Sequence, residues 1–284
     1  MKLIKAGYSI IEQEQGLLGV YKQIELAGRT CYKSECRITE DSAKEFVDRM
    51  VKLGHGAMLE HGTIYLTIPI TEWSNLAEFD SGYPSNPYSK VNDSQVDWVN
   101  WEGNVYITTN ARVLVENNWI ADLEYICNPT EFHEKRVTVR FTTDQGILRE
   151  FTRHRVFSFA VESTRYCNYS KSKFNNEITF IEPEWISDPR EINSPAYESA
   201  YEIFCSACEE AEGYYFTLID NGFPPQAARN VLPLATKCDM VMTGFVSDWE
   251  HFFKLRDASS AHPQARELAA PLHKEFKKKG LIKD

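Results

Sequence analysis

The segment KRVTVRFTT, residues 135–143, is the clearest strand pattern in the chain and constrains its fold most. Its apolar residues alternate with polar or charged ones, which is the period of a β-strand with one buried face. A helical pattern, GILREFTRHR, follows almost at once and leads into a cluster of cations. A half-buried strand needs a covering layer, so we expect a sheet with helices packed against it.

The rest of the chain contains further strand and helix patterns but no internal repeat and no nucleotide-binding glycine motif. Strands are expected in residues 2–11, 62–70, 104–109, 177–183 and 238–245. Helices are expected up to Gly28, in residues 39–55, 111–118, 145–155, 193–220, 224–233 and 247–257, and after Pro263. Ser247 and Glu250 have capping-box spacing. This segregated order predicts an α+β fold, an antiparallel or mixed sheet flanked by helices, rather than a doubly wound parallel sheet.

The chain carries no Gly/Ser-rich or Pro-rich linker, so we expect residues 1–284 to form a single domain. Residues from about 75 to 100 are rich in Ser, Asn, Asp and Pro, and we expect a long surface excursion there. No apolar run approaches the roughly 20 residues of a membrane helix. The N-terminal segment turns acidic too early for a signal peptide. These features predict a cytoplasmic protein that does not contact a membrane.

The net charge of −10 argues against a protein whose main task is to grip DNA or RNA. A small anionic ligand held by a few local cations remains open. The seven cysteines are an odd number without an export signal, which favours reduced thiols. Cys205 and Cys208 form a C-x-x-C, typical of a redox pair or half a zinc site. No second ligand pair follows, so we favour two core thiols and expect no metal site.

The acidic chain gathers cations in the segment RHRVFSFAVESTRYCNYSK, residues 153–171. On a helix, Arg153 and Arg155 would diverge by about 200° and each could serve a different phosphate. Ser163 and Arg165, with nearby backbone N–H groups, could form a second anion cradle in a turn. A solvated face with ion pairs would explain the RHR triplet alone. The longer pattern R-H-R-x7-S-x-R-Y favours a ligand site.

Four motifs along the chain, taken in their order, resemble those of a known protein family. They are GHGAMLEHGTIYL at residues 54–66, RHR-x7-S at 153–163, AARNVLPL at 227–234, and HFFKLRDASSAHPQARELA at 251–269. Over most of its length the chain resembles the flavin-dependent thymidylate synthases, the ThyX family. Residues from about 71 to 135 depart from the short members of that family and look like an insertion.

The resemblance implies reductive methylation of dUMP to dTMP. Methylenetetrahydrofolate would supply the carbon, NADPH the reducing equivalents, and FAD would carry the hydride, without a protein nucleophile. It also implies a homotetramer whose active sites are shared between subunits. Arg256 would be the catalytic residue that faces the uracil. The implied flavin contacts are His55, Arg153, His154, Arg155 and His251. The implied dUMP contacts are Glu150, Arg153, Glu162, Ser163, Thr164, Arg165, Arg229 and Arg256.

Some residues depart from the family pattern. Glu150 stands where short members often have Gln, and a carboxylate there cannot donate to a nucleotide oxygen unless it is protonated. The acidic residue of the Ser163 loop is shifted by one position, to Glu162. Phe245 replaces a polar flavin contact, and Cys31 replaces a small hydroxyl residue. Two alternatives stay open: another FAD- or FMN-dependent enzyme that modifies nucleotides, and a non-catalytic protein that binds nucleotides or RNA.

Overall fold

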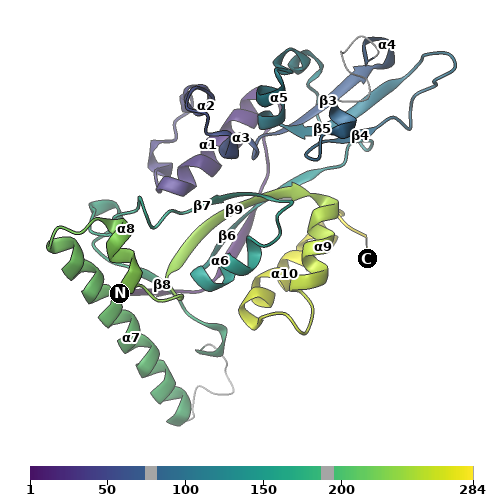
Figure 1. Cartoon of the computed structure of the whole chain (residues 1–284). Helices are drawn as coiled ribbons and strands as arrows, with labels where there is room; N and C mark the ends of the chain where they lie inside the picture. Colours follow the sequence, from purple (N-terminus) through teal and green to yellow (C-terminus); the bar gives the residue numbers. More distant parts are fainter. Residues whose placement is uncertain (74–81, 187–194, 284) are drawn as a thin grey trace.

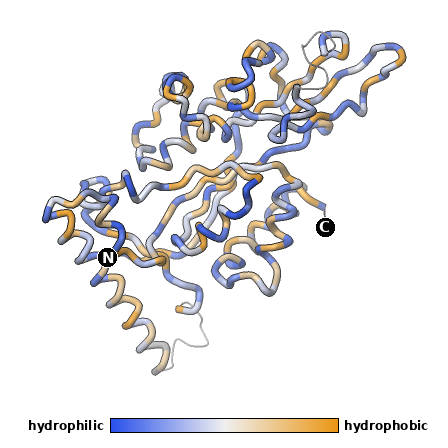
Figure 2. Tube along the Cα trace, viewed as in Figure 1, coloured by the Kyte–Doolittle hydropathy of each residue, from blue (hydrophilic) through white to orange (hydrophobic). Residues whose placement is uncertain are grey.

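A computed structural model of the chain describes residues 1–73, 82–186 and 195–283. A central sheet carries helices on both faces, and a smaller sheet extends from it at one end (Figure 1). Figure 2 shows apolar residues concentrated along the central strands and on the helices packed against them. Strands and helices alternate along the chain instead of being segregated, but the two larger sheets are antiparallel and flanked by helices, so the predicted α+β class is confirmed.

The central sheet has four strands in the order β2-β6-β9-β7, and all of its pairs are antiparallel. Its strands are β2 (Gly7–Ile11), β6 (Arg136–Asp144), β9 (Lys237–Phe245) and β7 (Ser158–Val161). The segment expected to be the clearest strand is β6, which pairs with β2 on one side and β9 on the other. Its alternating apolar residues therefore lie at the middle of the fold.

Three helices cover one face of this sheet: α6 (Gln145–Phe151), α9 (Val246–Arg256) and α10 (Pro263–Lys278). Met240 and Met242 of β9 point into this core. Val241, between them, points to the opposite face and packs with Ala27 of α1 (Gly16–Tyr32). The alternation along one strand thus explains why both faces of the sheet need helices.

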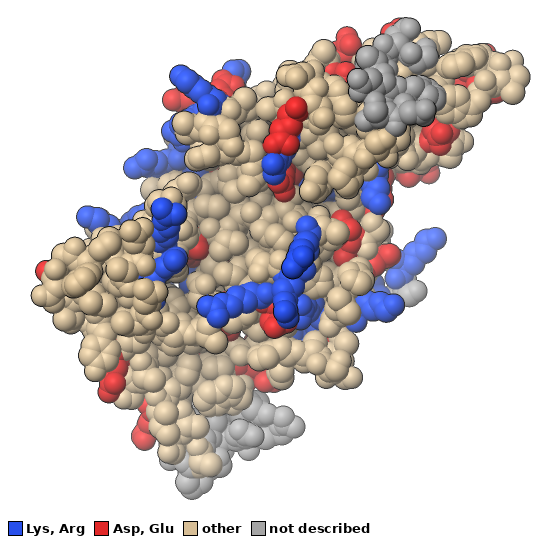
Figure 3. Space-filling view, in the orientation of Figure 1, with Lys and Arg blue, Asp and Glu red and all other residues tan. Residues whose placement is uncertain are grey.

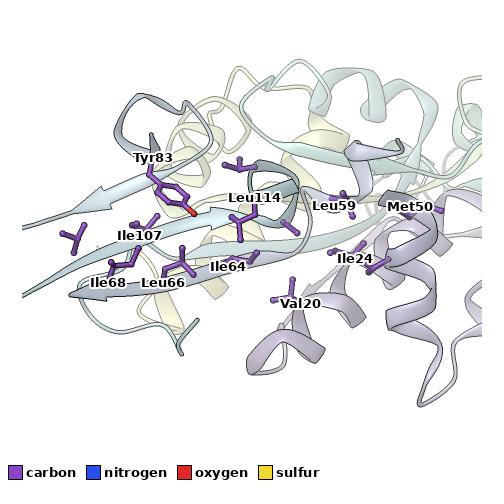
Figure 4. Close-up of a cluster of buried hydrophobic side chains, with 14 of the residues drawn as sticks. Val20, Ile24, Met50, Leu59, Ile64, Leu66, Ile68, Tyr83, Ile107 and Leu114 are labelled. Atoms are coloured by element: carbon purple, nitrogen blue, oxygen red, sulfur yellow. The ribbon is translucent and has the colours of Figure 1, made fainter. Parts of the chain in front are cut away.

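The second sheet contains β3 (Thr63–Pro69), β5 (Asn104–Asn110) and β4 (Lys90–Asn92), in the order β3-β5-β4. It shares a buried apolar core with α1 and with the helices α2 (Ser42–Lys52), α3 (Gly56–Leu59) and α5 (Ala111–Asn117) (Figure 4). The prediction of a surface excursion at 75–100 was wrong in part, because this stretch contains β4. Residues 74–81 lie outside the described residues.

Tyr83 shows why that excursion is not a simple polar loop. Its ring is buried in the core of the second sheet, and its hydroxyl donates to the Asp122 carboxylate over 2.7 Å. The segment 104–109 is a strand and 111–118 a helix, as expected. Packing of one buried aromatic residue therefore anchors a stretch whose composition is otherwise typical of a loop.

The remaining elements lie at the edges. They are β1 (Lys2–Ile4), which pairs in parallel with β8 (Thr179–Ile181), and the helices α4 (Ile70–Trp73), α7 (Pro195–Asp220) and α8 (Pro225–Ala228). Short 3₁₀ turns cover Glu35–Arg37, Tyr83–Ser85, Ile120–Tyr125, Ser172–Phe174, Glu184–Ile186 and Arg229–Val231. No helix among the described residues combines the length and apolar character needed to cross a bilayer.

Several predicted boundaries were wrong. Residues 2–11 form two strands, because β1 pairs with β8 and β2 with β6. The first helix continues to Tyr32, where Lys33 turns left-handed at φ 48°. The helix predicted for 224–233 is only the short α8 followed by a 3₁₀ turn.

The end of α6 and the start of α9 also differ from the prediction, and both lie next to candidate ligand-binding residues. The helix predicted for 145–155 stops at Phe151, so the RHR triplet follows the helix instead of lying on it. The prediction of a capping box formed by Ser247 and Glu250 was also wrong. The helix starts at Val246, the Asp248 carboxylate accepts from the Phe245 N–H over 3.2 Å, and Ser247 instead donates to Glu134.

Candidate functional site

The turn that follows α6 presents two arginines to solvent. Arg153 and Arg155 are exposed, whereas His154 between them is only 7% exposed. Figure 3 shows Lys and Arg side chains gathered near the middle of this face. Within the described part of the chain, neither guanidinium forms an ion pair or a hydrogen bond. Both are therefore available to an anionic ligand.

Beneath this turn, Arg256 joins α9 to α6. Its Nη1 donates to the Glu150 carboxylate over 2.6 Å, and its Nη2 donates to the Glu150 carbonyl over 2.7 Å. Its Nε donates to His154 Nε2 over 2.9 Å. His154 must therefore accept at Nε2, which leaves the ring neutral with its proton on Nδ1. Burial, helped by the Arg256 charge, lowers the pKa of His154 to about 4.

The packing of α9 explains why Arg256 arrives at this point. Trp249, Phe252 and Phe253 are buried in the core beneath the central sheet. The helix is thereby fixed, and its last turn places the guanidinium below the C-terminal end of α6. His251, on the same helix, is exposed, and its ring centroid lies 6.2 Å from that of His154. The structure thus brings Glu150, His154, His251 and Arg256 together.

The loop after β7 carries the second predicted group of ligand contacts. The Ser163 N–H is already used, because it donates to the Cys31 carbonyl over 2.9 Å. Arg165 is exposed, with its guanidinium 5.2 Å from the centre of the Tyr166 ring. Arg229 Nη1 donates to Thr164 Oγ1 over 3.1 Å. The backbone N–H of Ser163 is therefore not free to contribute to the predicted anion cradle, which leaves the side chains of this loop.

Thr164 and Arg229 line a pocket of about 330 Å³. Among the described residues, its lining is Gln145, Arg149, Thr164, Arg229, Asn230, Leu232, Pro233, Leu234 and Thr236. No carboxylate occurs among the described residues of this lining, although the chain is acidic. Sequence reasoning missed Gln145 and Arg149. Their spacing of four residues, on the helix that leads into RHR, was a signal that both lie on one helix face.

Glu162 lies in a buried ion cluster instead of this pocket. Its carboxylate accepts from Lys237 Nζ over 2.8 Å and from the Asp239 N–H over 3.1 Å. Lys33 Nζ lies 3.6 Å away and also pairs with Asp239. Burial alone would raise the pKa of Asp239, but Lys237 and Lys33 outweigh it and hold that pKa well below its usual range. The cluster anchors the start of the loop that carries Ser163.

The two N-terminal histidines have different surroundings. His55 is exposed at the start of α3, and no hydrogen bond or ring contact among the described residues joins it to the Arg153–Arg155 turn. His61 is fully buried, with Nδ1 2.8 Å from Thr243 Oγ1. Burial lowers the pKa of His61 to about 3. Within the described ranges, no three His, Cys, Asp or Glu side chains are grouped to hold a metal ion.

The departures from the family pattern are accommodated by packing. Phe245 is buried, with Arg136 and Lys90 lying 5.5 and 5.6 Å from the centre of its ring. Cys31 lies with its sulfur 3.9 Å from Met58 Sδ, and burial raises the pKa of its thiol to about 11.

The prediction that both C-x-x-C thiols face a core was wrong for one of them. Cys208 is 2% exposed and packs among apolar side chains, whereas Cys205 is only partly buried. Both positions lie on α7, three residues apart, and both thiols are free. Burial raises the pKa of Cys208 to about 11, which disfavours its reactive thiolate form.

Comparison with known proteins adds to this geometry. Residues 123–279 match the family described as "Thymidylate synthase complementing protein". The flavin-dependent thymidylate synthase of Haloarcula marismortui is 30% identical over 136 residues, which cover 44% of this chain and 55% of that protein. The one from Pyrococcus furiosus is 31% identical over 134 residues, covering 47% and 51%. The chain spans about half the length of the curated relatives it matches.

A solved structure, the UMP/dUMP methylase PolB of Streptomyces cacaoi bound with 5-Br dUMP, aligns with a TM-score of 0.45. It is 18% identical, and the alignment covers 98% of this chain and 93% of that one. The family match extends over more than half of the chain and includes the RHR turn, the Thr164–Arg229 pocket and Arg256. On this basis, the chain belongs to the flavin-dependent thymidylate synthase family.

Proposed function

We propose that this chain is a flavin-dependent enzyme that methylates dUMP to dTMP. The observation that carries the proposal is the convergence of Arg256, Glu150 and His154 beneath Arg153 and Arg155, which have no partner among the described residues. Family membership supports it, and the relatives named above are flavin-dependent thymidylate synthases. The whole chain would act as a single domain, with residues 71–135 as an insertion.

The residues of the RHR turn fit a flavin nucleotide. FAD carries a diphosphate, and Arg matches phosphate oxygens in pairs with its planar fork of donors. Arg153 and Arg155 are exposed and have no acidic partner among the described residues, in a chain of net charge −10. His55 and His251 would complete the flavin contacts. When bound, FAD would supply hydride transfer, with NADPH as reductant and methylenetetrahydrofolate as carbon donor.

Arg256 would polarise the uracil ring. Three of its N–H groups are used by Glu150 and His154, which fix the plane of the guanidinium. An Arg offers five such donors, so two remain beyond the contacts of the described residues. A fixed donor pair can stabilise negative charge as it develops on the ring oxygens and N3. The neutral His154 holds the guanidinium without adding a second charge.

The nucleotide would lie between this group and the β7 loop. Ser163, Thr164, Arg165 and Arg229 would hold the phosphate side of dUMP, and Thr164 and Arg229 already contact each other. Glu162 would act indirectly, since its carboxylate is bound by Lys237 and anchors the loop. As the family resemblance implies, the enzyme would be a homotetramer with shared sites, in which Arg153, His251 and His55, exposed on one chain, could meet a second subunit.

Spectroscopy and product analysis of the full chain test the proposal. The purified protein, alone or after incubation with FAD, should absorb in the visible range and lose that absorbance with NADPH. With dUMP and methylenetetrahydrofolate it should form dTMP. A protein that cannot be loaded with flavin, or a flavoprotein that leaves dUMP unmethylated, would overturn the proposal.

A further inference from the structure

We propose that Gln145 and Arg149 of α6 form the second wall of a site that binds the nucleotide 5′-phosphate as its dianion. The inference rests on the proposed function, because it assigns the substrate's phosphate to the pocket shared with Thr164 and Arg229. It adds two binding residues and a charge state that the family motifs did not indicate.

The two walls of this pocket are held at a fixed separation. The Gln145 N–H donates to the Leu234 carbonyl over 2.9 Å, which ties the start of α6 to the segment that carries Arg229. Asp144 caps the same helix, because its Oδ1 accepts from the Ile147 N–H over 2.7 Å. Gln264 donates to the other oxygen of Asp144 over 2.9 Å. The α6 side of the pocket is therefore held against the segment that carries Arg229.

Two side-chain donors of this lining, those of Gln145 and Arg149, have no acceptor among the described residues. Gln145 Nε2 is buried and has no hydrogen-bond partner among the described residues. An unsatisfied buried polar group costs about 1–3 kcal/mol, so a ligand that accepts from it would relieve that cost. Arg149, one turn further along α6, is exposed and has no acidic partner within the described residues. Its neighbour Glu150 is already engaged by Arg256.

The charges of the lining match one kind of ligand. Arg149 and Arg229 supply two positive charges, and no described residue adds a carboxylate to the lining. A phosphomonoester loses its second proton near pH 6, so it carries close to two negative charges at neutral pH. A volume of about 330 Å³ lies at the lower end of the range for small-molecule sites. This is room for a phosphate with part of its sugar.

Titration calorimetry with the full-length protein tests the inference. The ligands are dUMP, deoxyuridine and inorganic phosphate, and the variants are Arg149→Gln and Gln145→Leu. Arg37→Gln, an exposed arginine outside the pocket, is the control for the same change of charge. We expect Arg149→Gln to weaken dUMP binding by about 10- to 100-fold, the effect of losing one charge-assisted contact.

Deoxyuridine, which lacks the phosphate, should bind the unmodified protein and every variant with the same affinity. The affinity of the unmodified protein for dUMP should fall as the pH drops below about 6, and this fall should be smaller in Arg149→Gln. The inference is overturned if Arg149→Gln binds dUMP as tightly as Arg37→Gln does. It is equally overturned if the affinity of Arg149→Gln for deoxyuridine falls by the same factor as its affinity for dUMP. It is also overturned if the unmodified protein binds neither dUMP nor inorganic phosphate. Arg149-dependent binding of dUMP by a protein that makes no dTMP would uphold the inference and reject the proposed function.

Discussion

Arg256 and Glu150 are joined twice, through the carboxylate over 2.6 Å and through the backbone carbonyl over 2.7 Å. This pair links the last turn of α9 to the end of α6 and leaves the guanidinium with a fixed plane. A glutamine, common at the position of Glu150 in short family members, would offer a neutral oxygen to the same donor. The carboxylate therefore gives this chain a charged anchor for the residue proposed to activate the base.

Replacement of Arg256 by Lys should lower turnover of dUMP by about 10²–10³, the scale seen on losing one preorganised donor. Lysine keeps the charge but has no planar fork, so it cannot maintain the contacts with Glu150 and His154 together. A kinetic assay that separates flavin reduction by NADPH from dTMP formation would measure the change. Flavin content and flavin reduction without dUMP should survive. Normal turnover, or a loss explained entirely by missing flavin, would exclude Arg256 as the activating group.

Replacement of Arg155 by Ala should weaken FAD binding. One charge-assisted phosphate contact is worth roughly 1.5–3 kcal/mol, which corresponds to about 10- to 150-fold in affinity. The fold should be unaffected, because Arg155 is exposed and unpaired among the described residues. Isothermal titration of FAD into the flavin-free protein measures the effect. An affinity equal to that of the unmodified protein would remove Arg155 from the flavin site.

The buried His154 should make stability depend on pH. Its pKa in the folded protein is about 4, below the ordinary value of 6.5. Between these values the unfolded chain binds a proton that the folded chain does not, so stability falls as pH drops from about 6.5 to 4. A tenfold difference in proton affinity between the folded and unfolded chains corresponds to about 1.4 kcal/mol, and we expect a loss of about 2–3 kcal/mol.

The matched variant for this prediction is His154→Gln, whose side-chain oxygen can still accept from Arg256 but does not titrate. Denaturant unfolding of both proteins between pH 7 and 4 measures the difference. The buried His61 remains in both proteins, so its own titration cancels in the comparison. Identical pH dependence in the two proteins would contradict the role assigned to His154.

Cys205 and Cys208 should be dispensable for the reaction. Both thiols are free, and α7 is not among the elements that line the Thr164–Arg229 pocket. The double replacement by Ala should keep dTMP formation within a few-fold of the unmodified protein. Because Cys208 is buried, some stability should be lost. Activity that disappears while fold and flavin content remain would show a role for the C-x-x-C pair.

Gly244 should tolerate no side chain. A Cβ there would lie 2.4 Å from two ring carbons of Phe157, in the core beneath the central sheet. We expect Gly244→Ala to lower the free energy of unfolding by about 1–3 kcal/mol, the usual cost of overpacking. Gly213→Ala is the control: it lies inside α7, and its Cβ would meet nothing within 4 Å. That change should be neutral or raise stability by up to about 1 kcal/mol. Equal unfolding curves for the two variants would refute the packing argument.

The sequence by itself determined the features that depend on near neighbours. The alternation in residues 135–143 specified β6, because one strand face must be buried whatever the partner strand is. The spacing of the RHR turn, Ser163 and the Arg229 motif identified the family, which the match over residues 123–279 confirms. A helical pattern could not show where α6 ends, since the chain leaves the helix at Phe151 to enter β7.

Only the tertiary structure decided which charged groups meet. Arg256 pairs with Glu150 across 106 positions, and Arg229 reaches Thr164 across 65. The same folding buried the Glu162 carboxylate with Lys237 and placed Arg149 and Arg229 in the lining of one pocket. The energy of such pairs depends on burial and on distances of a few ångströms. Those quantities are fixed by how the sheet and its helices pack, and a local pattern of residues does not contain them.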